Sequence, residues 1–182
     1  NAVGVGPGIG VSQEIQQNLC QLFTESSQNN LPIVIDADAI NNIAEDRSLE
    51  KIIPKNAILT PHPKEFKKLV NRDWKDDYQK LQILKEYAVN QQVIVCLKGA
   101  NTAIALPDGS IHFNSTGNAG MAKAGSGDVL TGMILGLLAQ GYTPHEAAIL
   151  GVYEHGLAGD RAVSKRSVNS IIASDIIEEI RF

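Results

Sequence analysis

The chain has 182 residues, of which 43% are hydrophobic and 20% are charged, and its formal net charge is −4. This length and apolar content suit a folded domain with a sizeable core and exclude a disordered chain. The acidic balance argues against generic binding to nucleic acid or an anionic membrane, and no apolar run approaches the roughly 18 residues of a membrane span. Two cysteines without metal-type spacing, Cys20 and Cys96, favour a reducing compartment, so we expect a cytoplasmic protein.

Short apolar runs alternate with amphipathic patterns along the chain. The runs predict buried strands over residues 2–5, 31–35, 57–59 and 93–97. The amphipathic patterns predict helices over residues 12–24, 63–70, 78–88 and 125–140, and a further helix from residue 143 onward. Ser12 and Thr143 have the N-cap patterns of the helices that they begin. Strands separated by helices form a mainly parallel sheet with helices on both faces, so we expect a three-layer α/β/α fold.

The segment after the fourth strand departs from this alternation. Residues 102–106 and 110–113 flank a turn that contains glycine, and they predict one antiparallel hairpin. The helix over residues 125–140 is apolar nearly all round, so we expect it to be central and buried. Gly132 and Gly136, four residues apart on it, would permit close packing against a neighbour.

Loops of unusual sequence follow the four parallel strands. They are residues 6–10 (GPGIG), 36–38 (DAD), 60–63 (TPHP) and 98–102 (KGANT). Two glycine-rich segments, residues 117–120 and 125–128, follow the hairpin. Because α/β proteins bind their ligands at the carboxyl ends of parallel strands, we expect the functional site at this edge of the sheet.

Gly125-Ser126-Gly127-Asp128 lies at the start of the long apolar helix. Its backbone N–H groups and the helix dipole favour an anion such as a phosphoryl group. Asp128, in the first turn, would then be a general base that removes a hydroxyl proton. The alternative interpretation is a tight turn followed by an aspartate that the dipole favours. The density of glycines just upstream favours the anion site, since an ordinary turn needs fewer.

Several other features each allow two interpretations. Lys98 and the amides after it could meet nucleotide phosphates, or Lys98 could be a strand-end lysine in solvent. Residues 6–10 could bring backbone close to a ligand or form a plain turn, and they fail the spacing of the G-x-G-x-x-G dinucleotide fingerprint. His62, between two prolines, could contact a ligand or cap a helix. Asp36 and Asp38 could bind Mg²⁺ through water or cap the next helix, and we prefer the cap. The remaining histidines show no ligand spacing and are interpreted as structural or surface residues: His112, His145 and His155.

Four segments occur in an order that is typical of one enzyme family. They are residues 5–10 (VGPGIG), 35–41 (IDADAIN), 59–66 (LTPHPKEF) and 118–132 (NAGMAKAGSGDVLTG). Together they resemble the ADP/ATP-dependent NAD(P)H-hydrate dehydratases of the ribokinase-like superfamily, and the resemblance runs from about residue 3 to the C-terminus. It implies a ribokinase-like α/β/α fold and a lyase that repairs hydrated NADH and NADPH.

The resemblance implies a reaction in two stages. A nucleotide, ADP or ATP, donates its terminal phosphoryl group to the hydroxyl of the hydrate. Elimination of phosphate then restores NADH or NADPH. Mg²⁺ is expected to bridge the nucleotide phosphates, and no protein residue is assigned as its ligand.

The resemblance also assigns roles by position. Asp128 resembles the base that acts on the substrate hydroxyl. The residues that resemble the anion hole are Gly125, Ser126 and Gly127. The residues expected to bind the nucleotide are Lys98, Gly99, Ala100, Asn101, Thr102 and Gly127. The residues expected to contact the hydrated dinucleotide are Gly8, His62 and Asp128.

Family members carry a substantial segment before the GPG loop. We therefore expect residues 1–182 to be a single ribokinase-like domain that is incomplete at its N-terminus. Three alternatives stay open for the segment: it was removed, it is supplied as a separate chain, or it was never part of this protein. A homo-oligomer is expected, with no nucleic acid or membrane as partner. Two alternatives stay open: a small-molecule kinase of the same superfamily, such as a vitamin-precursor kinase, and a non-catalytic module that binds adenine nucleotides.

Overall fold

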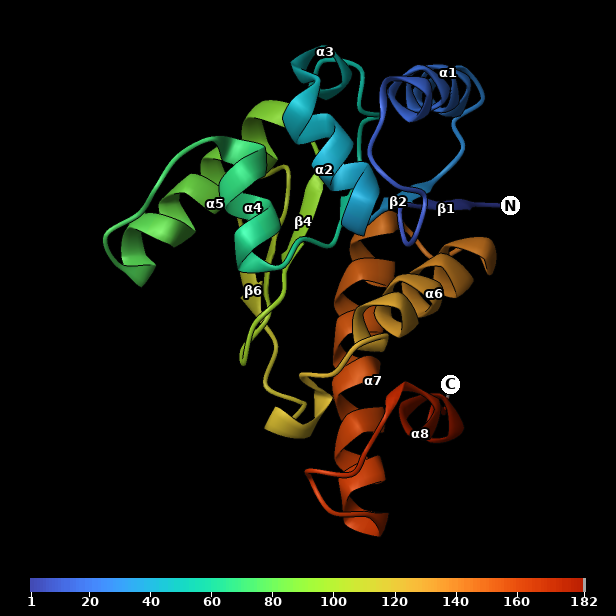
Figure 1. Ribbon diagram of the computed structural model, residues 1–182, viewed down its shortest axis with the longest axis vertical. Coiled ribbons are helices and arrows are strands. Elements are labelled where there is room, and N and C mark those ends of the chain that lie inside the picture. The colour runs from blue at the N-terminus through green and yellow to red at the C-terminus, as the bar shows by residue number, and fades with distance from the viewer. Residues whose placement is uncertain (182) are drawn as a thin grey trace.

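The computed structural model describes residues 1–181 and contains a six-stranded sheet with the strands in chain order (Figure 1). The strands are β1 (Val3–Val5), β2 (Ile33–Ile35), β3 (Ile58–Leu59), β4 (Ile94–Leu97), β5 (Ala103–Ala105) and β6 (Ile111–Phe113). The first four are parallel, whereas β5 is antiparallel to both β4 and β6. The mainly parallel sheet with an antiparallel hairpin is therefore confirmed.

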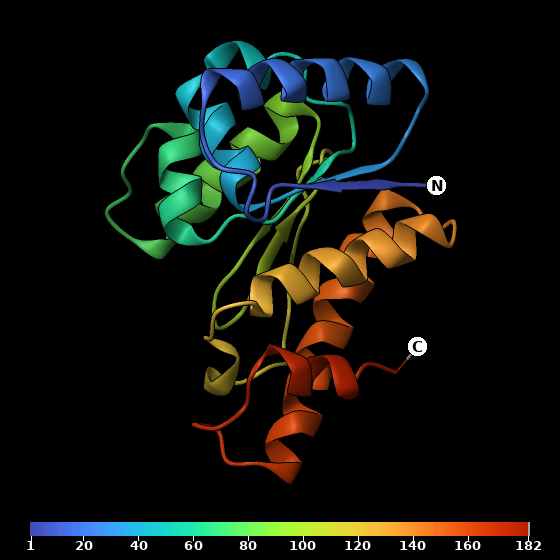
Figure 2. The ribbon, with the colours of Figure 1, turned by 45° about the vertical axis from the view of Figure 1, so that its right-hand side comes forward.

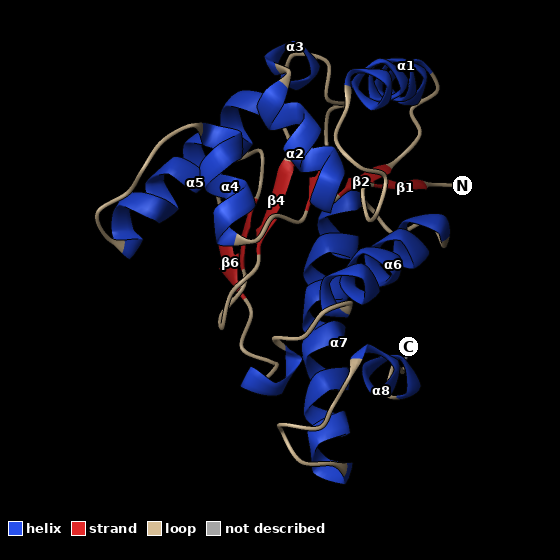
Figure 3. Ribbon diagram, viewed as in Figure 1, coloured by secondary structure: helices blue, strands red, loops and turns tan. Residues whose placement is uncertain are grey.

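Helices cover both faces of the sheet, which gives the three layers that the sequence predicts (Figures 2 and 3). One layer contains α1 (Gln13–Gln28), α2 (Ala37–Glu45), α3 (Arg47–Glu50), α4 (Pro63–Val70) and α5 (Asp77–Gln91). The other contains α6 (Ser126–Ala139) and α7 (Pro144–Lys165), and α8 (Ala173–Glu178) packs against both of them. A short 3₁₀ helix, η1 (Ala119–Met121), precedes α6.

The core is divided between the two faces by the alternation of side chains along each strand. Ile33 and Ile35 of β2 pack with the layer that contains α1 to α5, whereas Val34 between them packs with α6 and α7. Cys96 of β4 is buried on the second face, and this burial raises the pKa of its thiol to about 12. The thiol is therefore an inert filler of the core. Within residues 1–181, no helix combines the length and apolar character that a membrane crossing needs.

The caps predicted at Ser12 and Thr143 are present, whereas Ser174, predicted to cap the last helix, lies inside α8, whose N-cap is Ile172. Ser12 Oγ accepts a hydrogen bond from the Ile15 amide, and α1 continues to Gln28, beyond the predicted end. Thr143 and Glu146 form a reciprocal capping box at the start of α7, with Pro144 in the first turn. Satisfied amides at these ends fix where each helix begins.

The close packing expected at two glycines of α6 occurs elsewhere. A methyl group on Gly132 or Gly136 would meet nothing within 4 Å, so this prediction is wrong. On α7, a methyl group on Gly156 would overlap Thr116, and one on Gly159 would overlap Met121. The glycines that permit close approach therefore lie on α7, where the segment before α6 rests against it.

Candidate active site

The loops after the parallel strands begin side by side at one edge of the sheet. Val5, Ile35 and Leu59 are aligned as the last residues of β1, β2 and β3. The amide of Asp36 donates to the carbonyl of Val5, and the amide of Thr60 donates to the carbonyl of Ile35. The strand register thus places the beginning of each loop beside that of its neighbour, at the edge where parallel sheets bind ligands.

An ion pair between a buried carboxylate and a partly exposed lysine lies beneath these loops. The carboxylate of Asp36, which is 1% exposed, accepts a hydrogen bond of 2.9 Å from Lys98 Nζ at one oxygen. Its other oxygen accepts a hydrogen bond of 2.8 Å from the hydroxyl of Thr131 in α6. Asp36 stands at the N-cap position of α2, but its side chain makes no capping hydrogen bond, so the preferred interpretation as a cap is wrong. Lys98 is correspondingly a partner of a buried carboxylate and not a solvated strand end.

The GSGD segment lies directly above this ion pair. Gly125 is the N-cap of α6 and has a φ of +84°, a left-handed conformation that favours glycine. A Cβ built on Gly127 would lie 3.3 Å from Lys98 Nζ, so the backbone of the turn contacts the ammonium group. Asp128 is exposed in the first turn of α6. Helix N–H groups without intrahelical partners, a cation beneath them and an exposed carboxylate therefore share one small region.

Helix α7 holds the segment that leads into this turn. Asp160 accepts hydrogen bonds from the amide of Gly117, at 2.9 Å, and from the side-chain amide of Asn118, at 2.8 Å. The Thr116 hydroxyl donates to the carbonyl oxygen of Tyr153, at 2.8 Å. These contacts fix the glycine-rich loop against a long helix, which in turn fixes the position of Ser126 and Gly127. Asp160 is not among the site residues predicted from the sequence.

His155 of α7 lies beside the turn. Its Nε2 is 3.4 Å from the hydroxyl oxygen of Ser126. Burial lowers the pKa of the imidazole from the usual 6.5 to about 4, and the nearby Lys98 charge acts in the same direction, so the ring is neutral at physiological pH. His155 was predicted to be a structural or surface residue, and that prediction did not include its contact with Ser126, a candidate anion-hole residue. The signal that could have found it is the unusual density of glycine around it in α7.

The remaining predicted site residues lie in loops at the same edge. His62 is the N-cap of α4, where its Nδ1 accepts from the amides of Lys64 and Glu65, and its half-exposed ring has Nε2 3.3 Å from a Glu65 oxygen. Gly8 is exposed in the loop after β1. Asp38 accepts a hydrogen bond from the Gly10 amide and so ties that loop to α2.

The KGANT loop forms a turn between β4 and β5. Gly99, Ala100 and Asn101 are exposed, whereas Thr102 is buried and its hydroxyl donates to the Gly99 carbonyl. The amide of Lys98 donates to the carbonyl of Pro61, which joins this loop to the one after β3. An exposed turn next to the Lys98 ammonium leaves backbone groups open to a ligand.

The side chains that the structure describes in this region do not form a recognisable metal-binding site. Within residues 1–181, no cluster of three or more His, Cys, Asp or Glu side chains has the geometry of a metal site. The Asp36 oxygens are engaged by Lys98 and Thr131. The arrangement fits an ion that arrives on phosphate oxygens, because Mg²⁺ commonly keeps its waters and uses few protein ligands.

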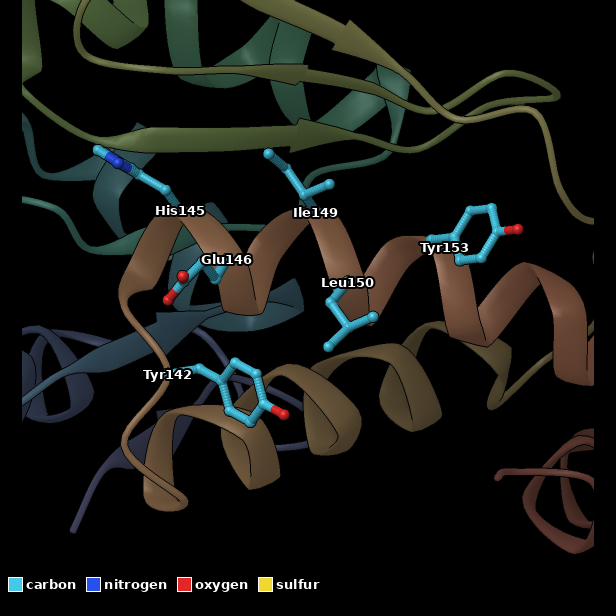
Figure 4. Close-up of a pocket in the computed structure, with 6 residues that line it drawn as sticks. All are labelled: Tyr142, His145, Glu146, Ile149, Leu150 and Tyr153. Atoms are coloured by element: carbon cyan, nitrogen blue, oxygen red, sulfur yellow. The ribbon is translucent and has the colours of Figure 1, made fainter. Parts of the chain in front are cut away.

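An apolar hollow of about 410 Å³ lies away from this edge (Figure 4). Its six lining residues come from the turn after α6 and from the first part of α7: Tyr142, His145, Glu146, Ile149, Leu150 and Tyr153. Since α6 starts at the GSGD turn and runs away from it, the turn at its far end is remote from the candidate active site. The hollow therefore extends along α7 from the far end of α6, and it meets the region described above at Tyr153, whose carbonyl accepts from Thr116.

Comparison with known proteins assigns the family. A family model described as NAD(P)H-hydrate dehydratase matches residues 1–181. The chain belongs to the NAD(P)H-hydrate dehydratase family. This confirms the family that the four sequence segments indicate.

Curated relatives in the NAD(P)H-hydrate dehydratase family are longer than this chain. The bifunctional NAD(P)H-hydrate repair enzyme of Moorella thermoacetica is 40% identical over 179 residues, which cover 98% of this chain and 33% of that protein. The ADP-dependent (S)-NAD(P)H-hydrate dehydratase of Bacillus subtilis is 34% identical over 186 residues, which cover 98% of this chain and 63% of that protein. The chain thus spans between about a third and two thirds of the length of these two relatives.

Solved structures agree with this assignment. The ADP/ATP-dependent NAD(P)H-hydrate dehydratase from Bacillus subtilis, co-crystallized with ATP/Mg²⁺, is 32% identical with a TM-score of 0.84, over 98% of this chain and 62% of that one. A ribokinase-like superfamily protein from Enterococcus faecalis is 26% identical with a TM-score of 0.75, over 97% of this chain and 63% of that one. Hydroxyethylthiazole kinase from Pyrococcus horikoshii, at 14% identity and a TM-score of 0.80 over 98% of this chain and 70% of that one, shares the fold alone. The ribokinase-like fold is therefore confirmed.

Proposed function

We propose that this chain carries the nucleotide-binding and reacting part of an enzyme that dehydrates hydrated NADH and NADPH at the expense of ADP or ATP. Family membership and the names of the relatives support the reaction. The observation that carries the proposal is the approach of Lys98 Nζ to Gly127, because it joins the KGANT loop to the GSGD turn. One region thus offers a cation, helix N–H groups and an exposed carboxylate.

The proposed chemistry begins with phosphoryl transfer. Asp128 takes the proton from the hydroxyl of the hydrate, whose oxygen forms a bond to the terminal phosphorus of the nucleotide while the bond from that phosphorus to the leaving oxygen breaks. The carbon–oxygen bond of the resulting ester then breaks, and its electron pair leaves with the phosphate. Loss of a proton from the adjacent ring carbon restores the double bond of NADH or NADPH. The net products are the reduced dinucleotide, phosphate and the shortened nucleotide.

The residues have distinct proposed roles. The amides of Gly125, Ser126 and Gly127 stabilise the negative charge on the phosphoryl group during transfer, an electrostatic contribution that is often the largest in such reactions. For Ser126 this requires the amide to give up its long hydrogen bond of 3.3 Å to the Lys123 carbonyl. The nucleotide is held by Gly127 and by the KGANT loop, made up of Lys98, Gly99, Ala100, Asn101 and Thr102. Gly8 and His62 contact the hydrated dinucleotide. These roles are supported by the positions of the residues in the matched segments and by their placement at one edge of the sheet.

Mg²⁺ is proposed to accompany the nucleotide. When bound, it neutralises phosphate charge and orients the phosphoryl group. The engagement of the Asp36 oxygens supports coordination of the ion by phosphate and water. We also propose a cytoplasmic location, which is supported by the acidic composition and by the free cysteines Cys20 and Cys96. We propose in addition a homo-oligomer, which is supported by the exposed side chains of Tyr142 and Tyr153 beside the apolar hollow.

The test is to incubate the purified protein with NADPH hydrate, Mg²⁺ and either ADP or ATP. The proposal predicts recovery of the reduced-nicotinamide absorbance together with release of inorganic phosphate. A stable phosphorylated product, detected by mass spectrometry, would instead identify a small-molecule kinase. Nucleotide binding by calorimetry without any turnover would identify a binding module. Either of these two outcomes overturns the proposal.

A further inference from the structure

Asp36 joins three elements of the fold under the GSGD turn. It directly follows β2, its first oxygen accepts from Lys98, which directly follows β4, and its second oxygen accepts from Thr131 in α6. Its side chain is 2% exposed and that of Lys98 is 23% exposed. A charged group in this position is therefore nearly removed from water and fully engaged by the protein.

Stability does not explain such a pair. The cost of taking two charges out of water largely offsets their attraction, and apolar replacements of buried ion pairs are often neutral or stabilising. A lysine at the end of a strand would otherwise extend its flexible stem into water. The carboxylate and the Thr131 hydroxyl together fix the ammonium at one point.

That point faces the backbone of the candidate anion hole. A Cβ on Gly127 would lie 3.3 Å from Lys98 Nζ and 3.9 Å from the Asp36 oxygen that Thr131 also contacts. Both groups therefore lie against the turn, with the ammonium the nearer of the two. A side chain at position 127 would separate them from any ligand bound above.

We propose that Asp36 is a positioning residue, which holds the Lys98 ammonium beneath the GSGD turn so that its charge is in place when negative charge develops on the phosphoryl group. The proposal rests on the proposed function, and it assigns a role to Asp36 and Thr131 that the matched segments leave open. Charge that is already oriented needs no reorganisation during the reaction, so its benefit appears in the transition state more than in nucleotide binding.

Asp36→Asn is the direct test, since the amide preserves the shape of the carboxylate and can bond to both Lys98 and Thr131. We expect kcat for NADPH recovery to fall by about tenfold or more, because the ammonium is no longer held by an opposite charge. The Kd for ADP should stay within about threefold, because a loosened lysine can still reach a bound phosphate. Lys98→Met removes the charge itself and should weaken ADP binding as well as turnover.

Two conservative substitutions of Thr131 test its hydrogen bond to Asp36. Thr131→Val removes the hydrogen bond to Asp36 without changing the shape and should lower kcat in the same direction, whereas Thr131→Ser keeps the hydroxyl and should restore it. The matched control is Glu50→Gln, which breaks a partly buried ion pair with Arg47 in α3, in the other helical layer. It should leave both kcat and the ADP Kd unchanged. Equal loss of kcat in Thr131→Ser and Thr131→Val would overturn the proposal.

NMR of the nitrogen-15-labelled protein separates this inference from the proposed function. The Lys98 ammonium signal, identified by its absence in Lys98→Met, should be observable in the wild-type protein, shift when ADP is added and disappear in Asp36→Asn. If wild type recovers no NADPH but this signal behaves as expected, the proposed reaction fails and the positioning of Lys98 at the phosphates stands. If ADP shifts the Gly127 amide but not the ammonium signal, or if Asp36→Asn recovers NADPH at the wild-type kcat, the inference is overturned.

Discussion

The His155 imidazole lies 3.4 Å from the Ser126 hydroxyl, so a neutral ring of α7 contacts the first turn of α6. Burial is the main reason that its pKa falls from 6.5 to about 4. Between these two pH values the unfolded chain binds a proton that the folded chain does not. The free energy of unfolding therefore decreases as the pH falls through this window, and the decrease is complete below pH 4.

His155→Gln tests this linkage by removing the titration. Between pH 7.5 and pH 5, the wild-type free energy of unfolding in urea should fall by about 2 kcal/mol more than that of the variant. His145→Gln is the control, since His145 is exposed at the start of α7, and its pH dependence should match that of wild type. Parallel pH curves for His155→Gln and wild type would show that the imidazole is not held neutral by burial.

Asp128→Asn tests the proposed base. Recovery of NADPH should fall by about 100-fold to 10,000-fold, the usual contribution of general acid–base catalysis. Because Asp128 is exposed, the free energy of unfolding should change by less than about 0.5 kcal/mol. Glu14→Gln, which changes an exposed acidic residue in the first turn of α1, should leave turnover unaltered. A well-folded Asp128→Asn variant with near-normal turnover would remove Asp128 from the mechanism.

Gly156→Ala and Gly132→Ala test the packing of the glycine-rich loop on α7. The methyl group on Gly156 would overlap Thr116, which should lower the free energy of unfolding by about 1–3 kcal/mol. The same change at Gly132, inside α6 with open space around it, should raise it by about 0.5–1 kcal/mol, because alanine is the better helix former. Thermal unfolding of the two variants measures whether each change raises or lowers the free energy of unfolding. Stabilisation by Gly156→Ala would contradict the close contact between Gly156 and Thr116.

Local patterns were enough to predict the features that depend on neighbouring residues. Ser12 and Thr143 cap helices as expected, since a capping hydrogen bond reaches only two or three residues along the chain. The mainly parallel direction of the strands followed from the alternation of strands and helices, whereas their order in the sheet was not predicted. The loops then had to converge, because parallel strands end at the same edge.

Side-chain partners from distant segments could not be predicted in this way. The pattern at Asp36 is compatible with a cap, but its carboxylate is engaged by Lys98 and Thr131, 62 and 95 residues away in the chain. Gly132 has the spacing of a packing glycine, yet the long helix α7 supplies those contacts through Gly156. Tertiary contacts decide such choices, and a local pattern cannot specify which distant residue arrives.

The most direct test of the proposed reaction follows the hydroxyl oxygen of the substrate. NADPH hydrate labelled with oxygen-18 at its hydroxyl is converted with ADP and Mg²⁺, and the products are analysed by mass spectrometry. Transfer to that oxygen followed by loss of phosphate predicts one labelled oxygen in the inorganic phosphate for each NADPH recovered. Recovery of NADPH with the label in water would contradict phosphoryl transfer to the hydrate.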